Sequence, residues 1–81
     1  MDESKRKIIG QRVLEERKKL GLTRAELYRR TGVAPQTLLD IESGTTDYFV
    51  RTLFRLCKGL GVSLSYILSG DKNFAESGED D

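Results

Sequence analysis

The sequence predicts an all-α fold of five short helices, and three observations lead to this prediction. Apolar residues recur at helical spacing along successive segments of the chain. Threonine, serine or proline stands at the start of several of these segments, and glycine follows the end of most. The chain has 81 residues, and an all-helical bundle with local contacts is an economical way to build so small a core.

The first helix is predicted from Ser4 or Lys5 to Leu20, and Gly21 ends it. Its apolar residues lie at helical spacing: Ile9, Val13, Leu20 and either Leu14 or Ile8. Arg17 falls on the same face as Val13 and Leu20, so we expect it to be partly buried. A buried guanidinium needs a carboxylate partner, and the alternative is that Arg17 lies on the surface.

The second helix is predicted to begin after Thr23 and to run to about Thr31. Thr23 is an N-cap, and Glu26 three residues later completes a capping box. Gly32 ends the helix, because glycine readily takes the left-handed conformation of a helix C-cap. The next two residues, 33 and 34, are then expected to form a tight corner.

The third helix is predicted from Pro35 to about Glu42, since proline at the first helical position loses no hydrogen bond. Residues 43–44, Ser-Gly, stop it. At about 100° per residue, Ala34, Leu38 and Ile41 share one face and should point into the core. The opposite face holds Gln36 and Asp40, with Thr37 on one flank and a mostly exposed Leu39 on the other. A short helix held at a corner with its polar side outward meets the mechanical requirement for entering the major groove of DNA.

The last two helices supply much of the predicted core. The fourth runs from about Phe49 to Leu60, with a buried face made of Val50, Leu53, Phe54, Leu56, Cys57 and Leu60. Ser63 caps a short fifth helix, Leu64 to Leu68, which Gly70 ends. Leu64, Tyr66, Ile67 and Leu68 exceed the apolar residues that a short one-sided helix needs. The surplus predicts a second buried face on this helix.

The charge of the chain is unevenly distributed. Residues 1–70 hold thirteen Lys or Arg and eight Asp or Glu, whereas residues 71–81 hold one Lys and five acids. We expect residues 1–70 to form the folded domain and the acidic residues 71–81 to be a disordered tail. A basic body indicates a nucleic acid as a partner, although a solvated surface with a solubilising tail has the same composition.

The composition also excludes several classes of function. The chain has no histidine and one cysteine, so it offers no set of zinc ligands and no Cys-His nucleophile. We therefore expect no catalytic residues, no metal and no cofactor. We expect no membrane segment, because no apolar run approaches the length of about 18 residues. A single cysteine favours a reducing, cytoplasmic setting.

The segment from Thr23 to Glu42, with Gly-Leu before it and Ser-Gly after it, resembles the helix-turn-helix of the Cro and phage-repressor family, also called XRE-type. Ile9, Gly10 and Arg17 resemble the first helix of that family, and residues 53–70 resemble its last two helices. The resemblance covers residues 9–70. It implies a compact five-helix repressor-like domain, a pairing of Arg17 with Glu42, and a homodimer contacting itself through Leu64, Ile67 and Leu68.

The resemblance also implies a sequence-specific regulator, expected to be a repressor, that binds double-stranded DNA at a two-fold operator and is associated with the nucleoid. Bases would be contacted by Gln36, with Thr37 and further contributions from Pro35, Leu39 and Asp40. Phosphates would be contacted by Arg24, Ser43, Thr45 and Thr46. Asp47, in the same loop, would repel phosphates.

One departure from the family pattern leaves an alternative open. Residues 32–44 contain no Lys or Arg and carry Asp40 and Glu42, and Ala34 stands where the family prefers a hydroxyl. Affinity for DNA must then come from arginines outside this helix. The alternative is a protein-interaction module on the same fold, antitoxin-like or antirepressor-like, with an exposed surface of Leu39, Tyr48 and Phe49 for a partner. We expect Phe49 to pack over the core and Tyr48 to be exposed.

Overall fold

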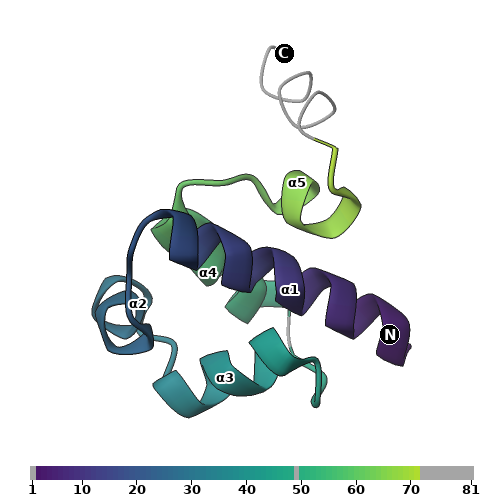
Figure 1. The fold of residues 1–81 in the computed structure, drawn as a ribbon, viewed down its shortest axis with the longest axis horizontal. Helices are drawn as coiled ribbons and strands as arrows, with labels where there is room; N and C mark the ends of the chain where they lie inside the picture. Colours follow the sequence, from purple (N-terminus) through teal and green to yellow (C-terminus); the bar gives the residue numbers. More distant parts are fainter. Residues whose placement is uncertain (1, 49, 72–81) are drawn as a thin grey trace.

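The structure is a computed structural model that describes residues 2–48 and 50–71, and the predicted all-α fold is confirmed. The helices are α1 (Glu3–Lys19), α2 (Arg24–Thr31), α3 (Pro35–Ser43), α4 (Val50–Leu60) and α5 (Leu64–Ser69). Figure 1 shows α1 crossing the molecule with α4 behind it, α3 below, α2 at one end and α5 above. The expected disorder of the acidic tail and the position of Phe49 lie outside the described residues, apart from Asp71.

The helix ends follow from local hydrogen bonds. Asp2 accepts a bond from the backbone N–H of Lys5, so α1 begins at Glu3, slightly earlier than predicted. The predicted capping box is present, because Thr23 and Glu26 each accept a bond from the other's backbone N–H, at 3.1 and 2.8 Å. The bond from the Thr23 backbone is the main reason that the pKa of Glu26 is lowered. These bonds satisfy donors that a helix N-terminus would otherwise leave unpaired.

The corner between α2 and α3 is built on Gly32, whose φ of 78° places it in the left-handed region. Thr31 fixes the corner from inside, since its hydroxyl donates to the Leu27 carbonyl at 2.8 Å and accepts from the Val33 N–H at 3.1 Å. Val33 is buried and Ala34 is exposed. The predicted core position of Ala34 is therefore wrong. Ala34 lies before the first turn of α3, and at this corner the neighbouring residue Val33 points into the core instead.

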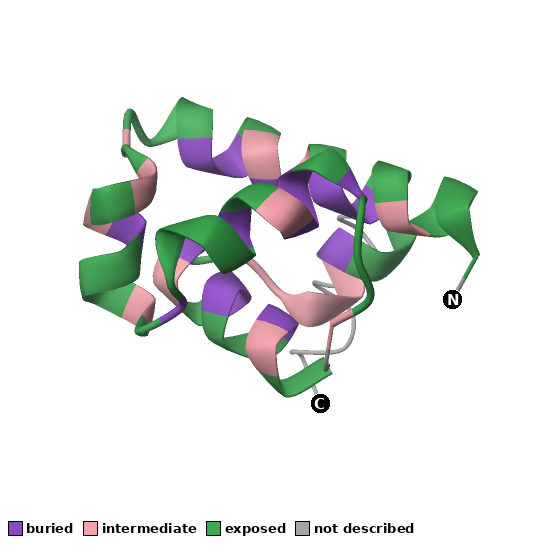
Figure 2. Cartoon of the chain, turned by 90° about the horizontal axis from the view of Figure 1, so that it is seen from below, coloured by how far each residue is buried: buried purple, intermediate pink, exposed green. Residues whose placement is uncertain are grey.

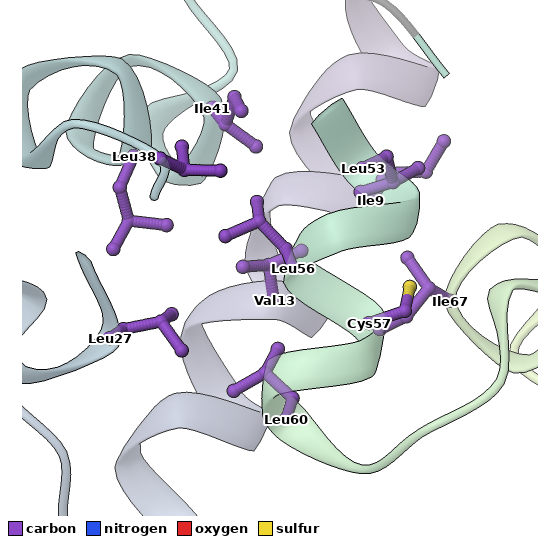
Figure 3. Close-up of a cluster of buried hydrophobic side chains, with 11 residues drawn as sticks. Ile9, Val13, Leu27, Leu38, Ile41, Leu53, Leu56, Cys57, Leu60 and Ile67 are labelled. Atoms are coloured by element: carbon purple, nitrogen blue, oxygen red, sulfur yellow. The ribbon is translucent and has the colours of Figure 1, made fainter. Parts of the chain in front are cut away.

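The core is a single cluster to which all five helices contribute (Figure 3). Its fully buried side chains are Ile9, Val13, Leu27, Leu38, Ile41, Leu53, Leu56, Cys57 and Ile67. Burial raises the pKa of the Cys57 thiol to about 11, so this thiol is an apolar core group without thiolate reactivity. Figure 2 shows the buried residues along the inward sides of the helices and exposed residues along their outer sides.

Three further residues predicted in the core are exposed. Val50 and Phe54 are 60% and 49% exposed, because only the 53, 56, 57 and 60 side of α4 faces α1 and α2. Leu20 is 49% exposed, since it lies at the C-cap of α1 where the chain turns away. For Val50 and Phe54 the helical periodicity is right, but the predicted buried face is too wide.

Helix α5 packs against α1 and α4. Arg12 of α1 donates to the carbonyls of Ile67 and Leu68 at 2.8 and 3.1 Å, and Tyr66 donates to the Glu16 carboxylate at 3.1 Å. Ile67 is fully buried within the chain, so it is wrong as a dimer contact. The face it occupies is the one that attaches α5 to its own domain, and Leu68, 40% exposed, lies outside that face. Among the described residues, none of the helices has the length and apolarity needed to cross a membrane.

Candidate nucleic-acid interface

Helix α3 presents a polar surface because its apolar side is fixed in the core. Leu38 and Ile41 are fully buried, and the exposed residues of the first turns are Pro35, Gln36, Thr37 and Leu39. Asp40 is partly exposed on the same outward side. The residues that the sequence analysis assigned to base reading therefore lie together on one accessible face of one helix.

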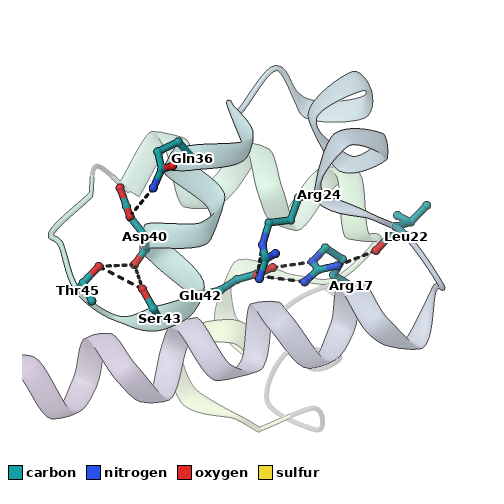
Figure 4. Close-up of polar contacts among 8 residues, drawn as sticks. All are labelled: Arg17, Leu22, Arg24, Gln36, Asp40, Glu42, Ser43 and Thr45. Atoms are coloured by element: carbon teal, nitrogen blue, oxygen red, sulfur yellow. Dashed lines mark hydrogen bonds and ion pairs between the residues drawn. The ribbon is translucent and has the colours of Figure 1, made fainter.

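Gln36 and Asp40 are joined on this face. The Gln36 amide donates from Nε2 to Asp40 Oδ1 at 3.1 Å, across one turn of the helix (Figure 4). The bond orients the glutamine, and it leaves the amide oxygen and a second N–H for other partners. The sequence analysis placed both residues on this face but did not predict the bond between them, although their i, i+4 spacing is a signal that could have revealed it.

The turn after α3 is closed on the Asp40 carbonyl. This oxygen accepts from the backbone N–H of Thr45 at 3.2 Å, the Ser43 hydroxyl at 3.2 Å and the Thr45 hydroxyl at 3.4 Å. The Thr46 hydroxyl donates to the carbonyl of Asp47. The hydroxyls of Ser43 and Thr45 lie 3.1 Å apart. All three residues expected to bind phosphate are exposed, but each hydroxyl must exchange a backbone partner to donate to a phosphate.

A buried ion cluster of Arg17, Glu42 and Arg24 lies where α1, α2 and the end of α3 meet (Figure 4). Arg17 donates to both oxygens of Glu42, at 2.7 and 3.1 Å, and to the Leu22 carbonyl at 2.8 Å. The structure thus contains the pair that the sequence analysis expected between Arg17 and Glu42. The side chains of Arg17 and Glu42 are only 8% and 2% exposed, so the cluster ties α1 to the end of α3.

Arg24, expected to contact a phosphate, has a partner within the chain that the sequence analysis did not predict. Its Nε donates to Glu42 Oε1 at 2.9 Å, and its side chain is 38% exposed. One carboxylate therefore serves two guanidinium groups, which leaves an excess positive charge at the partly exposed arginine. The Nη groups of Arg24 can still donate to a phosphate while its Nε stays bonded to Glu42.

Two basic residues of α1 were missed. Arg6 donates to the Gly44 carbonyl at 3.5 Å and to Asp47 at 3.3 Å, so it offsets the acid expected to repel phosphates. Lys7 passes so close to the turn that a Cβ on Gly44 would lie 2.7 Å from its Cγ. The sequence shows a basic start to α1, but nothing in it places that segment beside residues 44–47.

The apolar surface proposed for a protein partner is smaller than expected. Tyr48 is partly buried and packs against the core, so its expected exposure is wrong. Burial is also the main reason that its pKa is raised. Leu39 is 40% exposed, and Phe49 lies outside the described residues. Within residues 2–48 and 50–71, no group of acidic, cysteine or histidine side chains is arranged to hold a metal ion.

Comparison with known proteins supports the family and the fold of this chain. The helix-turn-helix family model matches residues 13–67. A relative from Sinorhizobium fredii (strain NBRC 101917 / NGR234), named as the uncharacterized HTH-type transcriptional regulator y4dJ, is 38% identical over 58 residues. That match covers 72% of this chain and 75% of the relative.

Two solved structures are also similar. The clp gene regulator ClgR from C. glutamicum is 28% identical with a TM-score of 0.73, over 78% of this chain and 81% of that one. An HTH_3 family transcriptional regulator from Vibrio cholerae is 27% identical with a TM-score of 0.79; the match covers 95% of this chain but only 43% of the other. Because the family match spans more than half of the chain and includes the corner between α2 and α3, this protein belongs to the Cro/C1-type (XRE) helix-turn-helix family of DNA-binding transcriptional regulators.

Proposed function

We propose that this protein is a sequence-specific repressor that binds a two-fold operator as a homodimer, in the cytoplasm at the nucleoid. The observation that supports this most directly is the polar outward face of α3, held by a buried apolar face and a buried ion cluster. A rigidly held helix of this kind can insert its N-terminal residues into a major groove. Phosphate contacts then fix its register, and base contacts select the sequence.

Base reading is assigned to Gln36, supported by Asp40. A glutamine amide can pair with the N6 and N7 edge of adenine, and the bond to Asp40 holds it in one orientation. Thr37, Pro35 and Leu39 can contact a thymine methyl group. Phosphates are assigned to Arg24 and to the turn residues Ser43, Thr45 and Thr46, with Arg6 and Lys7 beside them.

Base reading is tested by replacing Gln36 with alanine. We expect binding to the preferred duplex to weaken by about 1–3 kcal/mol, and the preference at one base pair to relax. Fluorescence anisotropy with a labelled duplex and its single-base variants measures both effects. Gln11→Ala is the matched control, because Gln11 is an exposed glutamine on α1 that also bonds an acid one turn away.

Asp40→Ala separates two roles of the acid. If Asp40 orients Gln36 or accepts from a cytosine N4, the variant loses sequence preference. If Asp40 only repels phosphates, the variant binds all duplexes more tightly. Wild-type protein that shows no salt-dependent binding to any duplex would contradict the DNA-binding proposal as a whole.

The homodimer is assigned to the exposed side of α5, with Leu68 and Leu64 as its apolar contacts. Leu68→Asp is expected to turn a dimer into a monomer without unfolding it, because Leu68 is 40% exposed. Sedimentation velocity at high micromolar concentration measures the change. Leu20→Asp, at a similarly exposed leucine on the end of α1, should leave the dimer intact.

A two-fold dimer would place the two α3 helices about 34–36 Å apart, one turn of DNA. A wild-type monomer would contradict the assignment.

A further inference from the structure

A cationic cleft of about 280 Å³ lies between α2 and α4 and has no part in the proposed contacts with DNA. Its lining residues are Arg30, Thr31, Arg55, Lys58 and Gly59. These include three positive charges from two helices, and within the described chain no acidic residue lines the cleft. Like charges gathered in this way repel one another, so a bound anion would remove an unfavourable interaction.

The cleft is held by close packing of the two helices. A Cβ on Gly59 would lie 2.3 Å from the Thr31 methyl group, so the absence of a side chain at Gly59 lets α4 approach α2. Arg30 donates to the Gly59 carbonyl at 3.2 Å, which fixes one guanidinium at the rim. The Lys58 ammonium lies 5.5 Å from the centre of the Phe54 ring.

The ends of the helices explain only part of this charge. Arg30 and Lys58 lie in the last turns of α2 and α4, where a cation is favoured by the helix dipole. Arg55 lies in the middle of α4, and among the described residues it has neither an ion pair nor a side-chain hydrogen bond. It therefore adds a third charge that neither helix end requires.

We propose that this cleft binds a small, multiply charged phosphate compound. Two guanidinium groups offer planar pairs of N–H donors that match phosphate oxygens, and Lys58 adds a further donor. The volume of the cleft is close to the lower limit of small-molecule sites, about 300 Å³, which suits a compound with more than one phosphate group.

The position of the cleft gives the ligand a route to α3. Arg30 and Thr31 are the last residues of α2, and the Thr31 hydroxyl bonds the Val33 N–H inside the corner. A ligand that bonds Arg30 therefore acts on the end of α2, next to the corner that sets the direction of α3. A ligand bound here would in this way change the affinity of the protein for DNA. That effect rests on the proposed function, whereas binding of the ligand to the cleft does not.

The site is tested with the full chain labelled with ¹⁵N and titrated with pyrophosphate at constant ionic strength. We expect saturable amide shifts at Arg30, Thr31, Lys58 and Gly59. Arg55→Gln should weaken binding roughly tenfold or more, the loss of one charge-assisted hydrogen bond. Arg51→Gln is the matched control, because Arg51 is an exposed arginine one turn earlier on α4 that does not line the cleft. The dispersion of each spectrum shows that the variants are folded.

Shifts that stay linear in pyrophosphate, or an equal loss in Arg51→Gln and Arg55→Gln, would overturn the proposal and show diffuse attraction. A second arm measures duplex binding by the same variants without pyrophosphate. If Arg55→Gln weakens duplex binding while pyrophosphate gives no saturable shift, the cleft binds DNA phosphates and the proposal is wrong. The titration contains no DNA, so a negative result would not contradict the proposed binding of DNA. In the same way, a protein that binds no duplex could still give a saturable titration with pyrophosphate.

Discussion

Replacing Glu42 with alanine is expected to lower the free energy of unfolding by about 3–5 kcal/mol, because it removes one partner of a buried ion pair. The Arg17 side chain is 8% exposed and gives two hydrogen bonds to the Glu42 carboxylate. Without that carboxylate its charge stays buried and unpaired. A small domain has a total stability of about 5–15 kcal/mol, so the variant should lose a large share of its stability.

Thermal unfolding followed by circular dichroism measures this effect. A loss of this size lowers Tm by more than roughly 10 °C in a domain of 60–100 residues. Asp47→Ala is the control, because it also removes an arginine-bound carboxylate, but one whose side chain is 71% exposed. An exposed ion pair contributes about 0–1 kcal/mol, so this variant should unfold near the wild-type temperature. Equal Tm values for the two variants would show that the Glu42 cluster is not buried in solution.

Gly10→Ala is the second substitution from which we expect a large change in the free energy of unfolding. Whether the change is a loss or a gain tests how closely α1 and α3 pack. A Cβ at Gly10 would lie 2.1 Å from the Ile41 carbonyl oxygen and 2.9 Å from that of Glu42. Both oxygens belong to the backbone of α3, so these close contacts can be relieved only if α1 moves away from α3. Overpacking of this kind costs about 1–3 kcal/mol or more, and contact with rigid backbone favours the upper end.

Helix propensity alone predicts the opposite result, since alanine in a helix interior is favoured over glycine by about 1 kcal/mol. We therefore expect a net loss of stability in Gly10→Ala, measured by urea unfolding. Gln11→Ala, at the next and exposed position of α1, should stay within roughly 0.5 kcal/mol of wild type. A more stable Gly10→Ala protein would show that α1 and α3 are farther apart than the structure places them.

The sequence by itself determined the elements of this fold and the outward side of α3. Thr23 with Glu26, Gly32 and Pro35 are local signals, because each acts through hydrogen bonds or backbone angles of neighbouring residues. Helical periodicity placed Leu38 and Ile41 inside and Gln36 outside, since the face on which a side chain lies depends only on its spacing along the helix. Such interactions reach only a few residues along the chain, so they can be deduced without the rest of the fold.

The tertiary structure decided how faces and charges from distant segments are combined. It assigned Arg24 to the Glu42 carboxylate, placed Arg6 beside the turn after α3, and buried Ile67 against the chain's own core. Each result depends on the distance and rotation between helices that are far apart in sequence. Periodicity shows that a helix has an apolar side, but which edge of that side is covered depends on the neighbour packed against it.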